Sequence, residues 1–372
     1  MRAGWSVTIL ERAVPPRPKP CGECVNPGAV AALERLGVLE DVLALAPAPL
    51  AGWAVGADRG GALARGRFPC GREGLGLDRA RFDHALLAAA RRAGVQVEEG
   101  RRVTGDDPVL AEASIVVGAD GLRSVIARSL AAYRRAPRLR KLSITLHLEG
   151  VALDPREGRL WLDELGTVGL APLDPEGQRW NGTVVVDAAA HGREAAGDPA
   201  GFALGRIAAA LAALPAAGAA PRVTDGPWTS GPFDWPGRRA VADGALLVGD
   251  AAGYFDPLTG QGIFRALRSA ELAADAIDTA LRAGRALCRD LAPYERALRR
   301  ELAAPLRVQR GVEAVISRGG LRRTAIGLLG LRARPMDALI AVTGDLEPPR
   351  ALLRPTLWAD LFRGAGRRDA AS

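Results

Sequence analysis

The chain has 372 residues, of which 48% are hydrophobic and 25% charged, the composition of a globular protein with a sizeable core. Its formal net charge is +8, but the basic residues are scattered arginines, and Lys19 and Lys141 are the only lysines. Because no run combines basic with aromatic residues, the charge does not indicate a nucleic-acid-binding groove, and we predict no nucleic-acid partner.

The cysteines, at positions 21, 24, 70 and 288, follow no secreted disulfide framework, and the first residues do not resemble a signal peptide. We therefore predict a cytoplasmic location. No uninterrupted apolar run reaches the roughly 20 residues that a membrane-spanning helix needs. Peripheral contact with a membrane stays open, because the stretch from residue 318 combines Arg with Leu and Ile. Packing of that stretch against the rest of the protein is the alternative.

The first half of the chain alternates strand and helix patterns. Residues 4–11 predict a short strand that ends in an acid, and residues 28–46 and 80–93 predict amphipathic helices. Further strands are predicted within 95–100 and 113–121. This alternation is typical of a parallel sheet with helices on its faces.

The pattern changes between residues 139 and 230, where short β-rich runs are punctuated by Gly, Pro and Asp. These runs predict an antiparallel sheet, interrupted by one Ala-rich helix near 200–214. The parallel pattern resumes with a strand at 245–249 and a long helix at 261–283, and further helices follow. We therefore predict an α/β protein, with a three-layer parallel-sheet domain, an inserted antiparallel β-rich domain and a helical C-terminus.

The stretch GDAAGYFDPLTGQGI, residues 249–263, places an acid and several small residues where a predicted strand passes into a predicted helix. In an α/β sheet a ligand binds beyond the carboxyl ends of the strands. Asp250 can accept hydrogen bonds from hydroxyl groups there, and the small residues let a ring or a phosphate approach the backbone. Free N–H groups at the start of the helix would face the same space. The alternative is that this stretch is a plain connection between a strand and a helix that binds no ligand.

This stretch closely resembles the flavin-contacting segment of the FAD-dependent oxidoreductases that include geranylgeranyl reductases and p-hydroxybenzoate-hydroxylase-like monooxygenases. VVGADGLRSVIAR, residues 116–128, is similar to their Asp-Gly motif, and LDRARFDHALLAAARRAGVQV, residues 77–97, to the stretch before it. KPCGE, residues 19–23, resembles the Cys-Gly segment of the reductase branch. The resemblance covers most of the chain from 1 to about 300. It implies FAD as the cofactor and NAD(P)H as a transient electron donor.

The resemblance also implies which residues bind FAD. Asp250 matches the acid that binds the ribityl or pyrophosphate part, with Gly249, Gly253 and Gly260 in the same segment, and Gly262 and Ile263 match contacts to the isoalloxazine ring. The other matches are Asp120 and Gly121 in the Asp-Gly motif, Arg79 before a helix start, Val103 near the adenine, and Cys21 and Gly22 beside the flavin. No catalytic residue is assigned, although Cys21 is a candidate because of its place near the flavin.

Glu11 resembles the acid that binds the ribose in this family. A G-x-G-x-x-G turn should precede that acid by about 20 residues, so we expect the first strand and this turn to be missing and the grip on FAD to be weakened. A wrongly assigned start and a real truncation stay open as explanations. The expected FAD-binding domain comprises 1–50, 75–135 and 235–285, the substrate domain 51–74 and 136–234, and the helical region 286–372.

Cys21 and Cys24 form a C-x-x-C pair, which suits packing beside the cofactor, a redox dithiol or half of a zinc site. A second cysteine pair is absent from the sequence, and His84, His147 and His191 lack metal-ligand spacing, so we predict no metal. Four tryptophans in or next to the inserted domain suit either the lining of an apolar substrate site or the core: Trp161, Trp180, Trp228 and Trp235.

Two enzymatic functions follow from the resemblance. Reduced flavin would deliver hydride to a small apolar, prenyl-type substrate, or it would activate oxygen to hydroxylate an aromatic or polyketide-like substrate. The segments PCGE and DPLTGQGI favour the reductase. A degenerate relative that only binds an apolar ligand is the non-enzymatic alternative.

Overall fold

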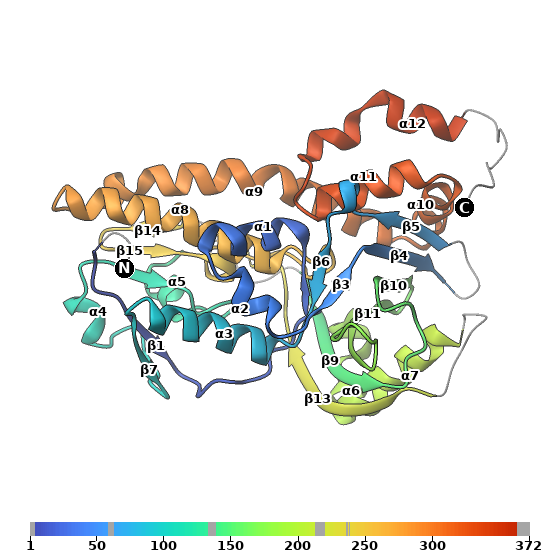
Figure 1. Ribbon diagram of the computed structural model, residues 1–372, viewed down its shortest axis with the longest axis horizontal. Helices are drawn as coiled ribbons and strands as arrows, with labels where there is room; N and C mark the ends of the chain where they lie inside the picture. Colours follow the sequence, from blue (N-terminus) through green and yellow to red (C-terminus); the bar gives the residue numbers. More distant parts are fainter. Residues whose placement is uncertain are drawn as a thin grey trace.

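The computed structural model describes residues 4–58, 63–132, 139–212, 220–235, 237 and 239–362. Its largest sheet has seven strands and lies at one end of the molecule (Figure 1). It is antiparallel except for one parallel pair, β4 and β10, so the predicted antiparallel sheet is in fact mixed. In spatial order the strands are β13 (Arg222–Ser230), β9 (Lys141–Glu149), β12 (Arg179–Asp187), β11 (Gly166–Pro172), β10 (Glu157–Asp163), β4 (Gly52–Ala57) and β5 (Leu63–Arg67).

The predicted parallel sheet occurs as two separate pieces in the described parts of the chain. β1 (Thr8–Glu11) pairs in parallel with β7 (Gln96–Glu99), and β8 (Val116–Gly118) pairs in parallel with β15 (Ala245–Leu247). β14 (Val241–Ala242) adds an antiparallel strand to β15. The prediction of one three-layer parallel sheet is therefore wrong for these residues, because β1 and β8 both border a cavity and do not pair with each other.

A small antiparallel sheet connects these parts. Its strands are β2 (Cys24–Val25), β6 (Gly74–Gly76) and β3 (Ala48–Leu50), and the 3-10 turn η1 (Pro69–Gly71) precedes β6. It lies between the two-stranded parallel pieces and the seven-stranded sheet (Figure 1). This sheet therefore links the segment around Cys21 to the larger sheet.

The first predicted helix, 28–46, is two helices. α1 (Pro27–Leu36) begins at Asn26, whose side chain accepts the N–H of Ala29, and ends at Gly37 in the left-handed conformation (φ 73°). α2 (Leu39–Leu43) follows. The apolar pattern continues across this break because both helices contribute to one core cluster, while glycine adopts the left-handed conformation at no steric cost.

The helix predicted at 80–93 is confirmed as α3 (Arg79–Arg92), which begins at Asp78. The side chain of Asp78 accepts the N–H of Ala80 and so caps the helix. Two short helices, α4 (Val109–Glu112) and α5 (Val125–Ser129), flank β8 in the sequence.

The single Ala-rich helix predicted near 200–214 is also two helices. α6 (Ala188–Gly197) and α7 (Pro199–Leu211) meet at Asp198, whose extended backbone (φ −144°) ends the first helix and whose side chain caps the second. Both pack on the seven-stranded sheet, where the core includes Trp180, Leu146 and Ile207. Pro199 lacks a backbone N–H and stands at the first position of α7, a position that favours a new helix start.

The predicted long helix is confirmed as α8 (Gly262–Arg282), and α9 (Cys288–Ile316) lies beside it (Figure 1). The side of α8 that packs on α9 consists of small residues such as Ala273, Ala276 and Ala280. The larger residues Leu267 and Ile277 pack against the edges of two core clusters and also border the cavity.

The chain then forms α10 (Gly319–Leu331), α11 (Ala333–Thr343), the 3-10 turn η3 (Pro349–Leu353) and α12 (Pro355–Phe362). These elements gather over β4 and β5 at the far end of the seven-stranded sheet (Figure 1). Among the described helices, none has both the length and the hydropathy needed to cross a bilayer.

Candidate functional site

One cavity of about 2550 Å³ runs through the described structure. Its walls come from β1, β8, the start of α8, the Cys21 segment, one face of the seven-stranded sheet and the C-terminal helices. Ligand pockets usually measure about 300–1,000 Å³. The cavity is therefore large enough for a dinucleotide together with a second ligand.

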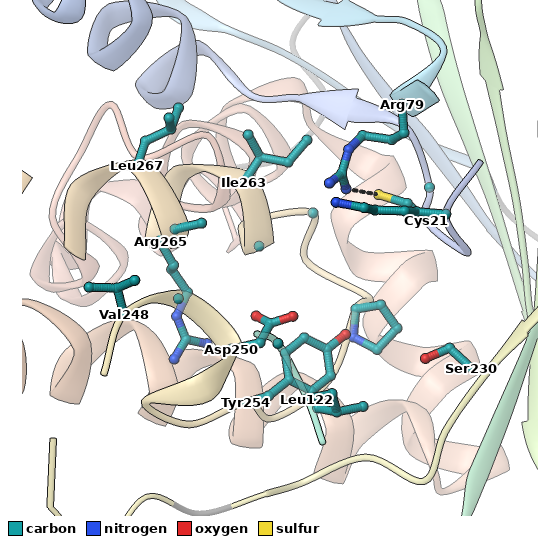
Figure 2. A pocket seen from close by; sticks show the side chains of 18 of the residues that line it. Cys21, Arg79, Leu122, Ser230, Val248, Asp250, Tyr254, Ile263, Arg265 and Leu267 are labelled. Atoms are coloured by element: carbon teal, nitrogen blue, oxygen red, sulfur yellow. Dashed lines mark hydrogen bonds between the residues drawn. The ribbon is translucent and has the colours of Figure 1, made fainter. Parts of the chain in front are cut away.

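Asp250 lies where β15 passes through the turn η2 (Gly249–Ala251) toward α8. Gly249 has a positive φ of 55°, and its N–H donates to the Ser269 hydroxyl at 2.8 Å, which fixes the turn. The Asp250 carboxylate points into the cavity (Figure 2), and no described residue donates a hydrogen bond to it. Burial raises its pKa, although the positive charges of Arg265 and Arg79 act in the opposite direction.

Arg265, from the first turns of α8, accompanies Asp250 in this corner (Figure 2). Its guanidinium donates to the Gly253 carbonyl at 3.5 Å, and burial lowers its pKa against the attraction of Asp250. Tyr254 faces Asp250 from the other side, and burial, together with the nearby carboxylates, raises its pKa well above the ordinary value. Sequence reasoning missed both residues, although each stands within or next to the motif that identified Asp250.

Four of the cavity-lining glycines explain what the site can accept. A side chain added at Gly22, Gly121, Gly260 or Gly262 would meet no atom within 4 Å and would project into open space. The residue before α8, Gln261, makes no side-chain capping bond, so the first N–H groups of this 21-residue helix are free for an anion. Open glycines, a free carboxylate and a helix N-terminus fit FAD, which carries hydroxyl groups and phosphates.

All but one of the predicted FAD-contacting residues line this cavity: Glu11, Cys21, Gly22, Arg79, Val103, Asp120, Gly121, Gly249, Asp250, Gly260, Gly262 and Ile263. Gly253 is the exception. Its φ of 143° turns it toward the backbone of Gly237, so that a side chain would lie 3.1 Å from the Gly237 nitrogen. Gly253 therefore permits close backbone packing beside the cavity, and its contact with the cofactor stays a prediction.

Two of the predicted carboxylates also hold the local backbone. The Glu11 carboxylate accepts the N–H of Ala13 at 2.9 Å, which bends the chain after β1. The Asp120 carboxylate accepts the N–H of Val125 at 2.5 Å, at the start of α5. Both residues still border the cavity, but part of their hydrogen-bonding capacity stabilises turns.

Cys21 lies across the cavity from Asp250 (Figure 2). The Arg79 guanidinium donates to the Cys21 sulfur at 3.3 Å and also pairs with both oxygens of Asp83 at 3.0 Å. The attraction of Cys21 and Asp83 outweighs burial and raises the pKa of Arg79, so this arginine is a permanent cation in the wall.

Cys24 does not form a disulfide with Cys21. Its thiol donates to the Gly22 carbonyl at 3.0 Å, and burial raises its pKa well above the ordinary value. Within the described parts of the chain, no group of three His, Cys, Asp or Glu side chains is arranged to hold a metal. Of the roles open to Cys24, the structure therefore fits packing beside the cavity best.

A buried polar cluster holds the Cys21 segment against the seven-stranded sheet, and no sequence pattern indicates it. Glu23, only 2% exposed, accepts hydrogen bonds from Asn181 at 2.9 Å and from the backbone N–H of Arg79 at 2.8 Å. His147 lies 2.7 Å from the same carboxylate. Asn181 also donates to the Cys21 carbonyl at 2.9 Å, so the position of Cys21 depends on residues from β9 and β12.

The structure distinguishes between the two roles, cavity lining and core packing, that the sequence left open for the four tryptophans. None of the four lines the cavity; Trp161 and Trp180 belong to the core between the sheet and α7, and Trp228 packs edge-on against His147. The cavity is lined instead by Trp5, by Trp53 of β4 and by Trp358 of α12. Strand alternation predicts that a tryptophan faces one side of a sheet. Which side is covered by helices and which borders the cavity depends on the tertiary structure.

Asp345 forms a second buried cluster behind the start of α8. Its two oxygens accept from Gln261 and Asn26, each at 2.7 Å, and Gln309 donates to Gln261 at 3.2 Å. The cluster therefore ties the C-terminal helices to the first residues of α8 and of α1.

Burial raises the pKa of Asp345 to about 7, despite the hydrogen bonds that lower it. The folded protein then keeps a proton that the unfolded chain, with a carboxyl pKa of about 4, has already released. The ionised carboxylate is therefore destabilising, and the free energy of unfolding should rise as the pH falls from about 8 to about 5. Denaturant titrations across this range measure the effect. Asp345→Asn should flatten the rise, and an unchanged rise in that variant would contradict the assignment.

Comparison with known proteins gives both a family and relatives. Residues 1–304 match the FAD binding domain family. Digeranylgeranylglycerophospholipid reductase 1 of Methanopyrus kandleri is 30% identical over 298 residues, which cover 73% of this chain and 74% of that protein. Digeranylgeranylglycerophospholipid reductase 2 of Methanothermobacter thermautotrophicus is 41% identical over 75 residues, only 20% of that protein.

Among solved structures, the flavin-dependent halogenase CmlS superposes with a TM-score of 0.68 and 25% sequence identity. The match covers 82% of this chain and 59% of CmlS, so this chain spans less than two thirds of the halogenase. The mixed α/β arrangement described above is therefore the fold of this flavin-dependent halogenase.

Proposed function

The chain belongs to the FAD binding domain family, and from this premise we propose that it is an FAD-dependent reductase acting on an apolar, prenyl-type double bond. NAD(P)H is the proposed transient electron donor. That the chain is a flavin-dependent oxidoreductase follows from the family. The reductase assignment is supported by the M. kandleri relative, whose name describes a reductase of a digeranylgeranyl phospholipid.

The observation that carries the proposal is that one cavity connects the Asp250 corner with an apolar lobe. We define this apolar lobe by Trp53, Leu160, Leu258, Met336 and Leu339, which come from β4, β10, the loop before α8, and α11. A long hydrocarbon chain gains about 25 cal/mol for each Å² of surface that it buries in such a lobe. The lobe therefore suits a prenyl chain whose reacting double bond reaches the cofactor corner.

When bound and reduced by the nicotinamide donor, FAD would supply a hydride to one carbon of the double bond, and a proton would be added to the other carbon. In this chain, Asp250 would hold the ribityl hydroxyls or the pyrophosphate, and the N-terminus of α8 would favour negative charge on the ring. Arg79 fixes the Cys21 thiol at the opposite wall. The apolar lobe would orient the substrate and exclude water from the reacting carbons.

Oxygen consumption separates this reaction from its main alternative. With a reduced nicotinamide and a prenyl lipid, we expect the donor to be oxidised and the substrate saturated, with no substrate-dependent oxygen uptake. Mass spectrometry in ¹⁸O₂ checks the product, and a reaction without substrate is the control for uncoupled oxidation. Incorporation of ¹⁸O into the product would overturn the reductase assignment.

The alternative is a monooxygenase that hydroxylates an aromatic or polyketide-like substrate, and it is supported by the structural similarity to a flavin-dependent halogenase. A ligand-binding relative without catalysis is the third alternative. This third alternative would be favoured if the chain bound FAD but oxidised no nicotinamide donor with any substrate tested.

A further inference from the structure

The C-terminal helices expose an unusual amount of apolar surface. Of the twelve large hydrophobic side chains that are exposed in the described structure, five lie between residues 319 and 362. They are Leu321, Leu328 and Leu331 of α10, Leu353 of η3 and Trp358 of α12, and Leu353 is 78% exposed. Grouped exposed hydrophobic residues mark a surface that contacts a partner or a membrane.

α10 is apolar on two opposite sides. Leu321, Leu328 and Leu331 are spaced by seven and three residues and therefore share one stripe, which faces solvent. Ile326 and Leu329 lie on the other side and line the cavity. The helix therefore separates the apolar lobe from the outside, and its solvent side carries these leucines together with the exposed Arg323 and Thr324.

Trp358 belongs both to the cavity wall and to the exposed surface. It lines the cavity, is 39% exposed, and its indole N–H donates to the Leu352 carbonyl at 2.7 Å. Leu352 also lines the cavity, and its neighbour Leu353 is exposed. The cavity therefore reaches the surface beside η3 and α12, at the end of the molecule where α10 and α11 also lie (Figure 1).

The same segment carries positive charge. Between residues 317 and 358 the sequence has seven arginines and three carboxylates, although the net charge of the whole protein is only +8. Arg322 is buried against Asp58, but five other arginines are exposed: Arg318, Arg323, Arg334, Arg350 and Arg354. Arginines beside exposed Leu and Trp complement an anionic lipid surface.

We propose that this C-terminal face, defined by the five exposed hydrophobic residues and the five exposed arginines, docks on an anionic lipid bilayer. The opening beside Trp358 then admits an apolar lipid chain directly from the bilayer into the cavity. Docking itself needs neither cofactor nor catalysis, whereas the entry of a prenyl substrate rests on the proposed function.

Vesicle sedimentation of the full chain tests the docking. Binding to phosphatidylcholine vesicles that contain phosphatidylglycerol should be about tenfold stronger than binding to phosphatidylcholine alone, and high salt should weaken it. Leu328→Glu combined with Leu331→Glu should reduce binding about tenfold, since charges are costly in the bilayer interface. Because both side chains are exposed, the variant should fold normally, which thermal unfolding checks.

Leu43→Glu combined with Leu165→Glu is the matched control. These leucines are 42% and 37% exposed, on α2 and on the turn between β10 and β11, and their replacement should leave vesicle binding unchanged. Trp358→Phe should also lose the fluorescence quenching caused by brominated phospholipids. Absence of binding to anionic vesicles at low salt, or an equal loss in the control, would overturn the proposal.

A second copy of the chain is the competing occupant of this face. Light scattering that finds a dimer in the parent protein and a monomer in the Leu328→Glu and Leu331→Glu variant would overturn docking on lipid. Since vesicle binding is measured without donor or substrate, its outcome does not depend on whether the reductase function is correct.

Discussion

Asp250→Ala is expected to weaken FAD binding by about ten- to a hundredfold. A hydrogen bond to a charged group contributes about 1.5–3 kcal/mol, and each 1.4 kcal/mol corresponds to a tenfold change in affinity. The Asp250 carboxylate borders the cavity and accepts no hydrogen bond from a described residue, so its capacity is reserved for a ligand. Titration of the ligand-free protein with FAD, followed by flavin fluorescence, measures the change.

The same substitution should leave the ligand-free protein at least as stable as the parent at pH 7. Burial raises the pKa of Asp250, so the folded state favours the protonated form and ionisation is destabilising. The stability advantage of Asp250→Ala over the parent should therefore shrink as the pH falls through the pKa of Asp250 in the folded protein. Loss of FAD affinity with loss of stability would indicate a structural role instead.

Two further variants complete this experiment. Asp243→Ala removes an exposed carboxylate just before β15 and should leave FAD affinity unchanged. Gly262→Val should lower affinity without strain, because a side chain there meets no protein atom within 4 Å and its φ lies outside the left-handed region. Unchanged affinity in both Asp250→Ala and Gly262→Val would contradict the placement of FAD in this corner.

Lys141→Met is expected to destabilise the fold by about 3 kcal/mol, the lower end of the usual cost of removing one partner from a buried ion pair, because the Lys141 side chain is partly exposed at the cavity. Lys141 of β9 lies 3.0 Å from Asp256 in the loop before α8 and 2.6 Å from Glu313 of α9. Burial acts to lower the pKa of Lys141, but the two carboxylates raise it. Without the ammonium group, two carboxylates would face each other in the interior.

Glu313 gives this cluster a dependence on pH. Burial raises the pKa of Glu313 even though Lys141 lowers it, so Glu313 takes up a proton at a higher pH than an ordinary glutamate does. The destabilisation in Lys141→Met should therefore decrease toward acid pH, where protonation of Glu313 removes one negative charge. Urea unfolding between neutral and acid pH measures this dependence.

The other lysine of the chain provides the matched control. Lys19 pairs with Asp83, which keeps its bidentate partner Arg79, and Lys19 is more exposed than Lys141. Lys19→Met should therefore cost about 1 kcal/mol or less.

Combining Lys141→Met with Asp256→Asn and Glu313→Gln should recover most of the stability, and equal losses for the two lysine variants would contradict the interpretation.

Local patterns predicted most elements and the cofactor corner. The helix at 79–92 has its capping aspartate at the preceding position, and the helix at 262–282 follows a strand and a glycine-rich turn. The family motifs indicated twelve residues that the structure brings to one cavity. The clusters around Asp345 and Lys141 could not be predicted, because their hydrogen-bonded partners are 319 and 172 residues away in the chain.

What the sequence determined by itself is local: the order of the elements, the placement of Asp250 between a strand and a helix, and the positive charge of the C-terminal segment. The tertiary structure decided everything that depends on distant packing, such as the turn of Gly253 toward Gly237 and the burial of Trp161 and Trp180. The physical reason is that backbone conformation depends on neighbouring residues. Whether a side chain meets solvent, core or cavity depends instead on elements that come together only in the folded chain.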